Sequence, residues 1–234
     1  MEEPPQKILV IRQSSIGDIL LTTPLLRILK KKYPKAAVDF VVKKQFYECI
    51  RTNPYVDTVY QLDTSRGMAE LRRLRKKIKA NRYEWIIDLH DNFRSIYLRS
   101  AGKNGRVLIF KKHKFIRFLL VKFKINLYRN PQPVYERYIH TASPLGLEYD
   151  HKGLDYFLDD STRSEIAGLL QENNFDFCAK TVCLAPGASF NTKRWPIEKF
   201  ARVAQKIQED LKMQIILTGG KDDVHLAREI EKKC

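Results

Sequence analysis

No hydrophobic run in this chain is long enough to cross a membrane, and no pair of cysteines has the spacing of a redox or zinc site. A membrane-spanning helix needs roughly 20 consecutive apolar residues, and none of the runs in the 234 residues approaches that length. The four cysteines include no C-x-x-C pair and show no metal-ligand rhythm with histidine. The opening, MEEPPQKILVI, carries acids where a secretory signal has lysines. These absences predict a cytosolic globular protein that is not exported.

Glycine is also too sparse for two common nucleotide-binding motifs. The first loop, RQSSIGD, has one glycine where the dinucleotide fingerprint G-x-G-x-x-G needs three. The phosphate-binding pattern G-x-x-x-x-G-K-[ST] occurs nowhere in the chain. We therefore expect neither a dinucleotide fold nor a P-loop enzyme.

Acidic residues are missing from a long central stretch. There is no Asp or Glu between Ser95 and Tyr135, although ten Lys and Arg fall inside it, and the whole chain carries a formal charge of +16. A field of one sign concentrates anionic partners, namely nucleic acid, acidic lipid or a phosphorylated substrate. Because the chain has no RNA-binding aromatic motif, nucleic acid is the weakest of these three expectations.

The first 160 residues alternate between strand and helix patterns. Continuous apolar runs such as KILVI indicate parallel strands buried on both faces, and lysine-rich amphipathic segments between them indicate helices. This rhythm predicts an α/β fold with a doubly wound parallel sheet, whose ligands bind outside the carboxyl ends of the strands. The expected strands are 7–11, 37–42, 56–62 and 85–90, and the expected helices are 19–33, in which Thr23-Pro24 is either a kink or a new helix start, and 68–83.

A second βα series begins near residue 160. We expect domains at 1–160 and 161–234, with a helix starting at Ser161, strands at 181–185 and 214–220, a helix opened by Pro196 and a last helix from about Asp222 to Cys234. Two strands are few for an independent α/β sheet. We therefore expect the chain to end within its second domain.

Asp18 lies where the first strand gives way to the first helix, after Ser14, Ser15 and Gly17. Backbone amides at such a junction attract anions, and glycine lets the backbone approach a ligand closely. A carboxylate there can take a proton from a hydroxyl held within hydrogen-bond reach. The alternative, which the spacing leaves open, is that Asp18 only caps the helix or complements its dipole.

The loop 186–195, PGASFNTKRW, links a buried strand to a helix. Glycine, two hydroxyls and two bases converge there at the positive end of the helix, which favours binding of a diphosphate over an ordinary exposed loop. Trp195 is interpreted as a packing residue. The residues concerned are Gly187, Ser189, Thr192, Lys193 and Arg194.

The segment DLHDNFRS (88–95) also follows a strand. The pattern of Asp88, His90 and Asp91 is a weak metal signal without a supporting ligand elsewhere, so no metal site is expected. Arg94 and Ser95 are candidates for substrate contact. The favoured interpretation of Asp88 is that it ties down a neighbouring loop.

Within the acid-free stretch, FIRFLLVKFKINLY (115–128) interleaves aromatic and aliphatic residues with bases. Such an amphipathic helix can lie on an anionic membrane with its apolar face in the headgroup boundary. It can equally be a helix that packs its apolar face into the core. The sequence leaves both interpretations open.

Several of these segments together resemble glycosyltransferase family 9, the ADP-heptose:lipopolysaccharide heptosyltransferases. The resemblance starts with KILVIRQSSIGDILLTTPLLRILKKKYP and continues through NPYVDTVYQLD, WIIDLHDNFRS, ERYIHTASPLGL, LAPGASFNTKRWPIEKFARVA and ILTGGKDD. It covers nearly the whole chain, with gaps. The opening S-x-G-D…T-P combined with P-G-A-S…K-R-W-P is specific to the family.

The resemblance implies a GT-B fold of two Rossmann-like domains, the second incomplete here, with the acceptor bound mainly by the first and the nucleotide sugar by the second. It implies inverting, metal-independent transfer of heptose from ADP-heptose to the anionic lipopolysaccharide core, without a cofactor, at the cytoplasmic face of the inner membrane. The implied catalytic residues are Asp18 as general base and Lys193 as stabiliser of the departing diphosphate. The other assignments are nucleotide-sugar binding by Gly17, Gly187, Ser189, Thr192 and Arg194, and acceptor binding by Arg94 and Ser95.

The chain departs from the family pattern after ILTGGKDD. Family members continue with further βα units and a D-S-G-P-x-H motif that helps to hold the nucleotide sugar, and neither is found in this sequence. We therefore expect a gene fragment, a frameshifted copy or one part of a split protein. The alternative function is a non-catalytic module that binds anionic glycolipid.

Overall fold

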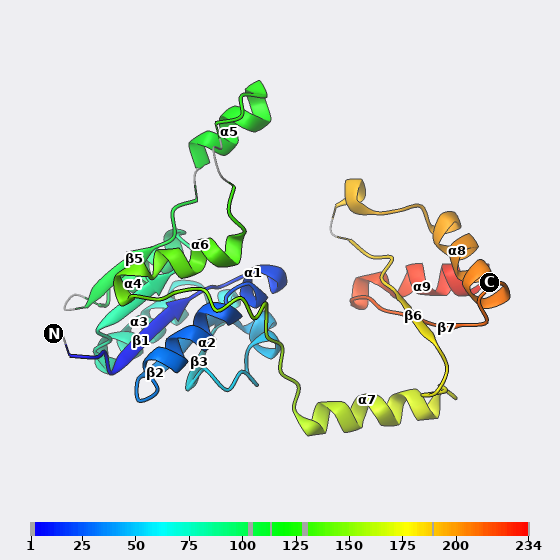
Figure 1. Cartoon of the computed structure of the whole chain (residues 1–234), viewed down its shortest axis with the longest axis horizontal. Coiled ribbons are helices and arrows are strands. Elements are labelled where there is room, and N and C mark those ends of the chain that lie inside the picture. The colour runs from blue at the N-terminus through cyan, green and yellow to red at the C-terminus, as the bar shows by residue number, and fades with distance from the viewer. Residues whose placement is uncertain (1–2, 103–104, 113, 128–130, 189, 234) are drawn as a thin grey trace. The chain divides into compact units, whose positions relative to one another are not determined.

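The computed structural model describes residues 3–102, 105–112, 114–127, 131–188 and 190–233 (Figure 1). The chain divides into two compact units, Met1–Asp160 and Ser161–Cys234. Among the described residues, no helix is both long and apolar enough to cross a membrane.

The first unit is built on a five-stranded parallel sheet with the strand order β3-β2-β1-β4-β5. Its strands are β1 (Lys7–Ile11), β2 (Ala37–Lys43), β3 (Thr58–Leu62), β4 (Trp85–Asp88) and β5 (Arg106–Ile109). Its α-helices are α1 (Ile16–Leu20), α2 (Thr23–Lys32), α3 (Gly67–Asn81), α4 (Phe93–Arg99), α5 (Lys114–Phe123) and α6 (Val134–Thr141), and its 3-10 helices are η1 (Lys44–Cys49), η2 (Thr64–Arg66) and η3 (Ser143–Leu145).

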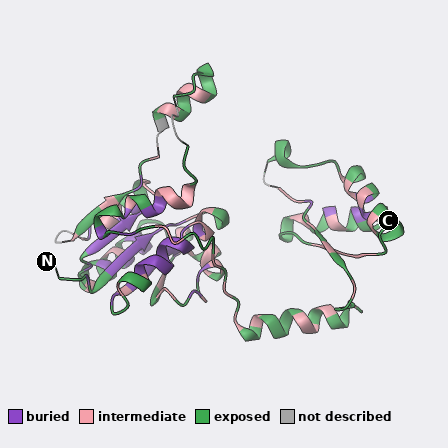
Figure 2. Cartoon of the chain, viewed as in Figure 1, coloured by how far each residue is buried: buried purple, intermediate pink, exposed green. Residues whose placement is uncertain are grey.

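Helices cover both faces of this sheet, and the apolar run of β1 explains why. Ile8 and Val10 belong to one buried cluster, together with residues of α2 and α6. Leu9 and Ile11 belong to a second cluster, together with residues of α3 and α4. Because successive side chains of a strand point to opposite faces, a strand with four successive apolar residues needs cover on both sides. Figure 2 shows the buried sheet, and the doubly wound arrangement predicted from the sequence is confirmed.

At Thr23-Pro24 the sequence left open a kink or a new helix start, and the structure confirms the new start. Pro24 lies in the first turn of α2, where its missing N–H and fixed φ begin a second helix. The edge strand β5 and the helix α6 were not predicted. β5 has only four residues, of which Val107 and Ile109 are 37% and 40% exposed, so it lacks the continuous buried pattern of β1.

A buried arginine fastens the end of the first unit to α2. The Arg27 guanidinium donates to both carboxylate oxygens of Asp150 at 2.8 and 2.9 Å and also pairs with Asp155. The hydrogen bond from Arg27 lowers the pKa of Asp150 to about 2, against the opposing effect of burial. Paired in this way, the charge is tolerated in a side chain that is only 8% exposed.

In the second unit the described residues contain a two-stranded parallel sheet, β6 paired with β7. Its small buried cluster centres on Ala201, Ala204 and Ile230. The strands are β6 (Thr181–Leu184) and β7 (Gln214–Leu217), the α-helices are α7 (Asp160–Glu172), α8 (Ile197–Glu209) and α9 (Val224–Glu231), and the 3-10 helices are η4 (Asn191–Lys193) and η5 (Lys221–Asp223).

Candidate functional site

The strand order of the first unit places its ligand crevice beside β1. The chain runs from β1 to β2 and β3 on one side and returns to β4 on the other, so the strand order reverses between β1 and β4. In open α/β sheets, ligands bind outside the carboxyl ends of the strands at such a switch point. The loops that follow β1 and β4 carry Asp18 and the segment 88–95, both singled out in the sequence.

Asp18 lies in the first turn of α1 and is anchored through one carboxylate oxygen. Its Oδ2 accepts from Arg12 Nη2 at 2.6 Å, from the Ser15 backbone N–H at 3.3 Å and from the Ser15 hydroxyl at 3.2 Å. The side chain is 37% exposed. Burial raises the pKa of Asp18, but the Arg12 charge and the hydrogen bonds from Arg12 and Ser15 outweigh it and hold the pKa below its ordinary value. Asp18 therefore both caps α1 and presents an ionised carboxylate at the strand ends.

Arg12 was not singled out in the sequence, and it is the central cation of this region. Its guanidinium donates to the Leu89 carbonyl at 2.5 Å and lies 5.6 Å from the centre of the Tyr138 ring. The Arg12 side chain is only 8% exposed. The one sequence signal for Arg12 is its position directly after a buried strand. The sequence does not show that the Arg12 side chain is itself buried.

Unpartnered polar atoms concentrate at the same place. Across the described part of the chain, the buried side-chain polar atoms without a hydrogen-bond partner are Arg12 Nε, Gln13 Nε2 and His90 Nδ1. All three belong to loops that follow β1 or β4. Buried polar groups are nearly always paired in folded proteins, so this concentration supports the switch point as the functional region.

The loop after β4 is held by Asp88, as the favoured interpretation of the sequence had it. Its Oδ1 accepts from the backbone N–H groups of His90 and Asp91, both at 2.9 Å, and its Oδ2 accepts from Arg99 at 2.6 Å. Burial, followed by the nearby charges of Arg12 and Lys112, lowers the pKa of His90 to about 4, although Asp88 opposes the shift. His90 is therefore neutral at physiological pH.

The two acceptor candidates on α4 differ in their surroundings. Ser95 is fully buried, and its hydroxyl accepts from the Asn92 N–H at 2.9 Å and donates to the Asn92 carbonyl at 3.0 Å. Arg94 is exposed and makes no hydrogen bond or ion pair within the described residues. The hydroxyl of Ser95 is occupied by the helix cap, whereas the Arg94 guanidinium is available to an anion. Acceptor binding by both residues stays a prediction.

Gly17 and Gly187, the two glycines assigned to nucleotide-sugar binding, differ in the space around them. A Cβ atom on Gly17 would meet nothing within 4 Å, so the backbone there is open to solvent. A Cβ atom on Gly187 would lie 2.2 Å from Cγ of Asp223. Gly187 therefore leaves room for the Asp223 side chain of the loop after β7, a requirement that the sequence did not reveal.

The basic end of the loop 186–195 is exposed. Lys193 lies in η4 with its Nζ 5.6 Å from the centre of the Phe190 ring, and Arg194 closes the loop by donating from Nε to the Ala188 carbonyl at 2.7 Å. Thr192 is also exposed. Trp195 packs edge-to-face on Phe200 at 5.2 Å, in agreement with a packing role. Ser189 lies outside the described residues.

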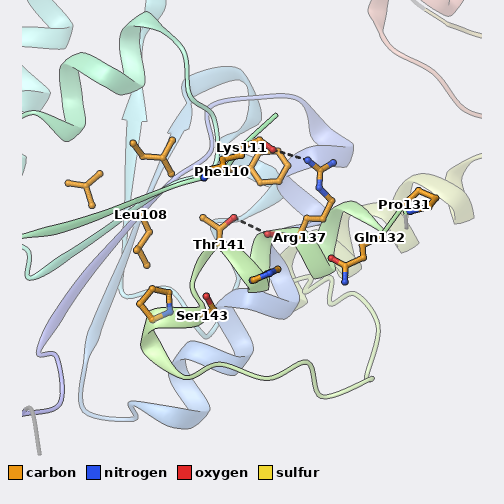
Figure 3. A pocket seen from close by; sticks show the side chains of 12 residues that line it. Leu108, Phe110, Lys111, Pro131, Gln132, Arg137, Thr141 and Ser143 are labelled. Atoms are coloured by element: carbon orange, nitrogen blue, oxygen red, sulfur yellow. Dashed lines mark hydrogen bonds between the residues drawn. The ribbon is translucent and has the colours of Figure 1, made fainter. Parts of the chain in front are cut away.

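A pocket of about 640 Å³ lies at the open edge of the sheet, between β5 and α6 (Figure 3). Arg137 on its wall donates to the Lys111 carbonyl at 2.8 Å and stacks 4.7 Å over the Phe110 ring. None of the residues assigned to the site from the sequence lines this pocket. Within the described ranges, no group of three or more His, Cys, Asp or Glu is arranged to hold a metal ion.

Comparison with known proteins places this geometry in a family. The sequence profile of glycosyltransferase family 9 (heptosyltransferase) matches residues 71–234. Lipopolysaccharide heptosyltransferase 3 of Escherichia coli is 24% identical over 231 residues, which are 93% of this chain and 65% of that protein. The chain thus spans about two thirds of the length of the curated relatives it matches.

Solved structures show the same fold. The glycosyl transferase family 9 protein of Veillonella parvula matches with a TM-score of 0.82 at 22% identity, over 97% of this chain and 66% of that one. An Escherichia coli heptosyltransferase solved with ADP-2-deoxy-2-fluoro heptose matches with a TM-score of 0.70 at 20% identity, over 97% and 73%. The likeness confirms the predicted α/β fold of GT-B type. With the profile matching well over half of its residues, the chain belongs to glycosyltransferase family 9.

Proposed function

We propose that the chain transfers a heptose, or a related sugar, from ADP-heptose to the lipopolysaccharide inner core, with inversion at the anomeric carbon and without a metal. The observation that carries this proposal is the ionised, half-exposed carboxylate of Asp18, anchored by Arg12 at the carboxyl end of β1. The relatives that the chain matches include lipopolysaccharide heptosyltransferases, which supports the substrate class.

In this proposal Asp18 is the general base. The proton of the acceptor hydroxyl moves to the Asp18 carboxylate while the hydroxyl oxygen bonds to the anomeric carbon. The bond from that carbon to the diphosphate oxygen breaks, and its electron pair leaves with the diphosphate. A positioned base of this kind contributes about 10²–10⁴-fold to a rate. The carboxylate is ionised at neutral pH and can therefore accept the proton, although its lowered pKa makes it a weaker base than an ordinary aspartate.

The second unit supplies the donor-binding residues of the proposal. Lys193 stabilises the negative charge that develops on the departing diphosphate, and Thr192, Ser189 and Arg194 bind the diphosphate with the loop backbone around Gly187. Gly17 in the first unit offers an open backbone to the nucleotide sugar. The exposed bases and the N-terminus of the 13-residue helix α8 support anion binding by this loop.

A transfer assay tests the proposed reaction. Incubation of the chain with ADP-heptose and a heptose-free lipopolysaccharide core is expected to release ADP and to yield a core extended by one heptose. Since no metal takes part, the yield is expected to stay the same with a chelator present. Binding of both substrates without any product would instead favour a non-catalytic glycolipid-binding module, and loss of product on chelation would contradict the metal-independent mechanism.

We further propose that α5 rests on the anionic cytoplasmic face of the inner membrane. Several apolar side chains of α5 are exposed, with Phe115 at 70%, Val121 at 66% and Phe123 at 54%, and Figure 2 shows the helix without buried residues. Exposure of this extent favours the membrane interpretation over core packing. Lys122 lies 5.5 Å from the Phe118 ring centre, so cationic and apolar groups lie together as a lipid headgroup boundary requires.

Vesicle binding tests the membrane contact. The chain is expected to sediment with phosphatidylglycerol-containing vesicles at low salt, and less so at high salt, because exposed charges are screened. Phe115→Ser combined with Phe123→Ser is expected to weaken binding several-fold, whereas the control Leu211→Ser, which replaces a leucine that is 62% exposed in the second unit, is expected to have no effect. Equal binding to neutral phosphatidylcholine vesicles, or no loss in the double variant, would refute the contact.

A further inference from the structure

The Asp18 carboxylate uses only one of its two oxygens for the contacts that hold it. The described hydrogen bonds and the ion pair of Asp18 all end on Oδ2, which faces Arg12 and Ser15. A carboxylate has about four lone-pair sites on two oxygens. The remaining oxygen, Oδ1, is therefore the one with free capacity to accept a proton, and the 37% exposure of the side chain leaves it accessible.

Arg12, the partner of Oδ2, is held in place by contacts with several elements of the first unit. Arg12 follows β1, its backbone N–H donates to the Val41 carbonyl of β2 at 3.1 Å, and its Nη1 donates to the Leu89 carbonyl after β4 at 2.5 Å. Its guanidinium also faces the Tyr138 ring of α6. The planar fork of an arginine presents its donors in a rigid geometry. Arg12 thus donates from Nη1 to the Leu89 carbonyl and from Nη2 to Asp18. Because the side chain is buried, its charge needs a counter-charge, which Asp18 supplies.

We propose that Arg12 is a positioning residue for the general base: anchored to the Leu89 carbonyl, it holds Oδ2 of Asp18 so that Oδ1 faces the acceptor hydroxyl. The proposal rests on the transfer function proposed above. It assigns two tasks to one guanidinium, namely orienting the carboxylate and lowering its pKa. Arg12→Lys keeps the positive charge but loses the planar pair of donors. The variant therefore separates the effect on the pKa of Asp18 from the orientation of its carboxylate.

Few charged and titratable groups surround Asp18, so the effect of Arg12 on the pKa of Asp18 can be measured. Arg12 approaches from the end of β1 and Tyr138 from α6, and Ser15 adds two uncharged donors. Burial raises the pKa of Tyr138 to about 12, so the tyrosine stays neutral over the range in which Asp18 titrates. Against the opposing effect of burial, Arg12 is therefore the cation that lowers the pKa of Asp18, together with the hydrogen bonds from Ser15.

Carboxyl-carbon NMR of the full chain tests the pair without requiring catalysis. The Asp18 resonance is assigned by its loss in Asp18→Asn. In Arg12→Gln its pKa is expected to rise by at least one unit, a tenfold weaker acid, while Arg12→Lys is expected to keep most of the depression. In the wild type the Arg12 guanidinium nitrogen shifts are expected to follow the Asp18 titration and to lose that step in Asp18→Asn. This second measurement does not need Arg12→Gln to fold.

Transfer kinetics then test the positioning. Arg12→Lys is expected to lower kcat at least tenfold with little change in the KM for ADP-heptose, and Arg12→Gln to move the acidic limb of the kcat profile to higher pH as well. An unchanged Asp18 pKa in Arg12→Gln together with guanidinium shifts that ignore pH would overturn the pairing, and an unchanged kcat in Arg12→Lys would overturn the positioning role. If the wild type makes no product, the proposed transfer fails while the NMR result stands by itself.

Discussion

Gly187 and Asp223 touch so closely that no side chain fits between them. A Cβ atom on Gly187 would lie 2.2 Å from Cγ of Asp223, and the same carboxylate accepts from the Gly220 N–H at 2.9 Å. The two loops that follow β6 and β7 therefore depend on each other for their shape. The absence of a side chain at position 187 is thus explained by packing, whether or not the backbone there also binds a ligand.

Gly187→Ala is expected to destabilise the second unit by about 1–3 kcal/mol, because the added methyl must displace a carboxylate that caps the following turn. Urea unfolding measures the change. Gly17→Ala is the matched control, since a Cβ there meets nothing within 4 Å, and it is expected to be near neutral for stability. Adding Asp223→Ala to Gly187→Ala removes the clash, so additive costs in the double variant would contradict this explanation.

Removal of the Arg27 side chain is expected to cost about 3–5 kcal/mol of unfolding free energy, because it leaves Asp150 and Asp155 with uncompensated charge. The exposed Arg66, 3.7 Å from Asp63, provides the control: Arg66→Ala is expected to cost less than about 1 kcal/mol. Denaturant titration of both variants tests this comparison. Similar costs would show that the Arg27 pairs contribute no more than a surface ion pair.

His90 is expected to make the first unit sensitive to mild acid. Its pKa is lowered to about 4 in the fold, against about 6.5 in an unfolded chain, so the unfolded state takes up the proton first. The contribution of neutral His90 to the stability of the fold is complete above about pH 6.5 and declines as the pH falls toward 4. His90→Gln is therefore expected to lose less stability than the wild type between pH 7 and pH 4.5 in thermal melts. Parallel curves for His90→Gln and the wild type would contradict a half-buried imidazole that is neutral in the fold.

Arg94→Ala is expected to raise the KM for the anionic acceptor about tenfold, the equivalent of one charge-assisted hydrogen bond, with little change in the KM for ADP-heptose or in stability. Arg94 has no described partner in the protein, whereas Arg99 on the same helix pairs with Asp88 at 2.6 Å and Asp91 at 3.1 Å. Arg99→Ala is therefore expected to destabilise the fold instead. Steady-state kinetics with both substrates, and melting curves of both variants, separate the two roles.

The strands whose residues are buried on both faces were predictable, because burial of that kind leaves an uninterrupted apolar run, as in KILVI. β5 was not, since an edge strand of four residues with half-exposed Val107 and Ile109 has no such pattern. The break between α1 and α2 was also ambiguous, because the apolar periodicity continues through Thr22 and Thr23 to Pro24, and only the backbone shows where the second helix begins.

The site was predictable where chemistry follows a strand in sequence and not where it depends on distant contacts. Asp18 stands out because a carboxylate and a glycine follow β1 directly. Arg12 does not, because its importance arises from the Leu89 carbonyl 77 residues away and from the Tyr138 ring. The need for glycine at position 187 likewise arises from Asp223, which belongs to the loop after the next strand.

The most direct test of the account is the kcat of Asp18→Asn compared with that of Asp57→Asn. Both carboxylates form an ion pair, Asp18 with Arg12 at 2.6 Å and Asp57 with Lys30 at 2.7 Å. Both side chains are partly exposed, at 37% and 43%. Asp57 accepts from the Val38 N–H near the start of β2. It therefore lies at the amino ends of the strands, whereas Asp18 lies at their carboxyl ends. General-base catalysis by Asp18 predicts that Asp18→Asn lowers kcat by about 10²–10⁴-fold while Asp57→Asn stays within about twofold of the wild type. An Asp18→Asn variant that transfers heptose at the wild-type rate would contradict it.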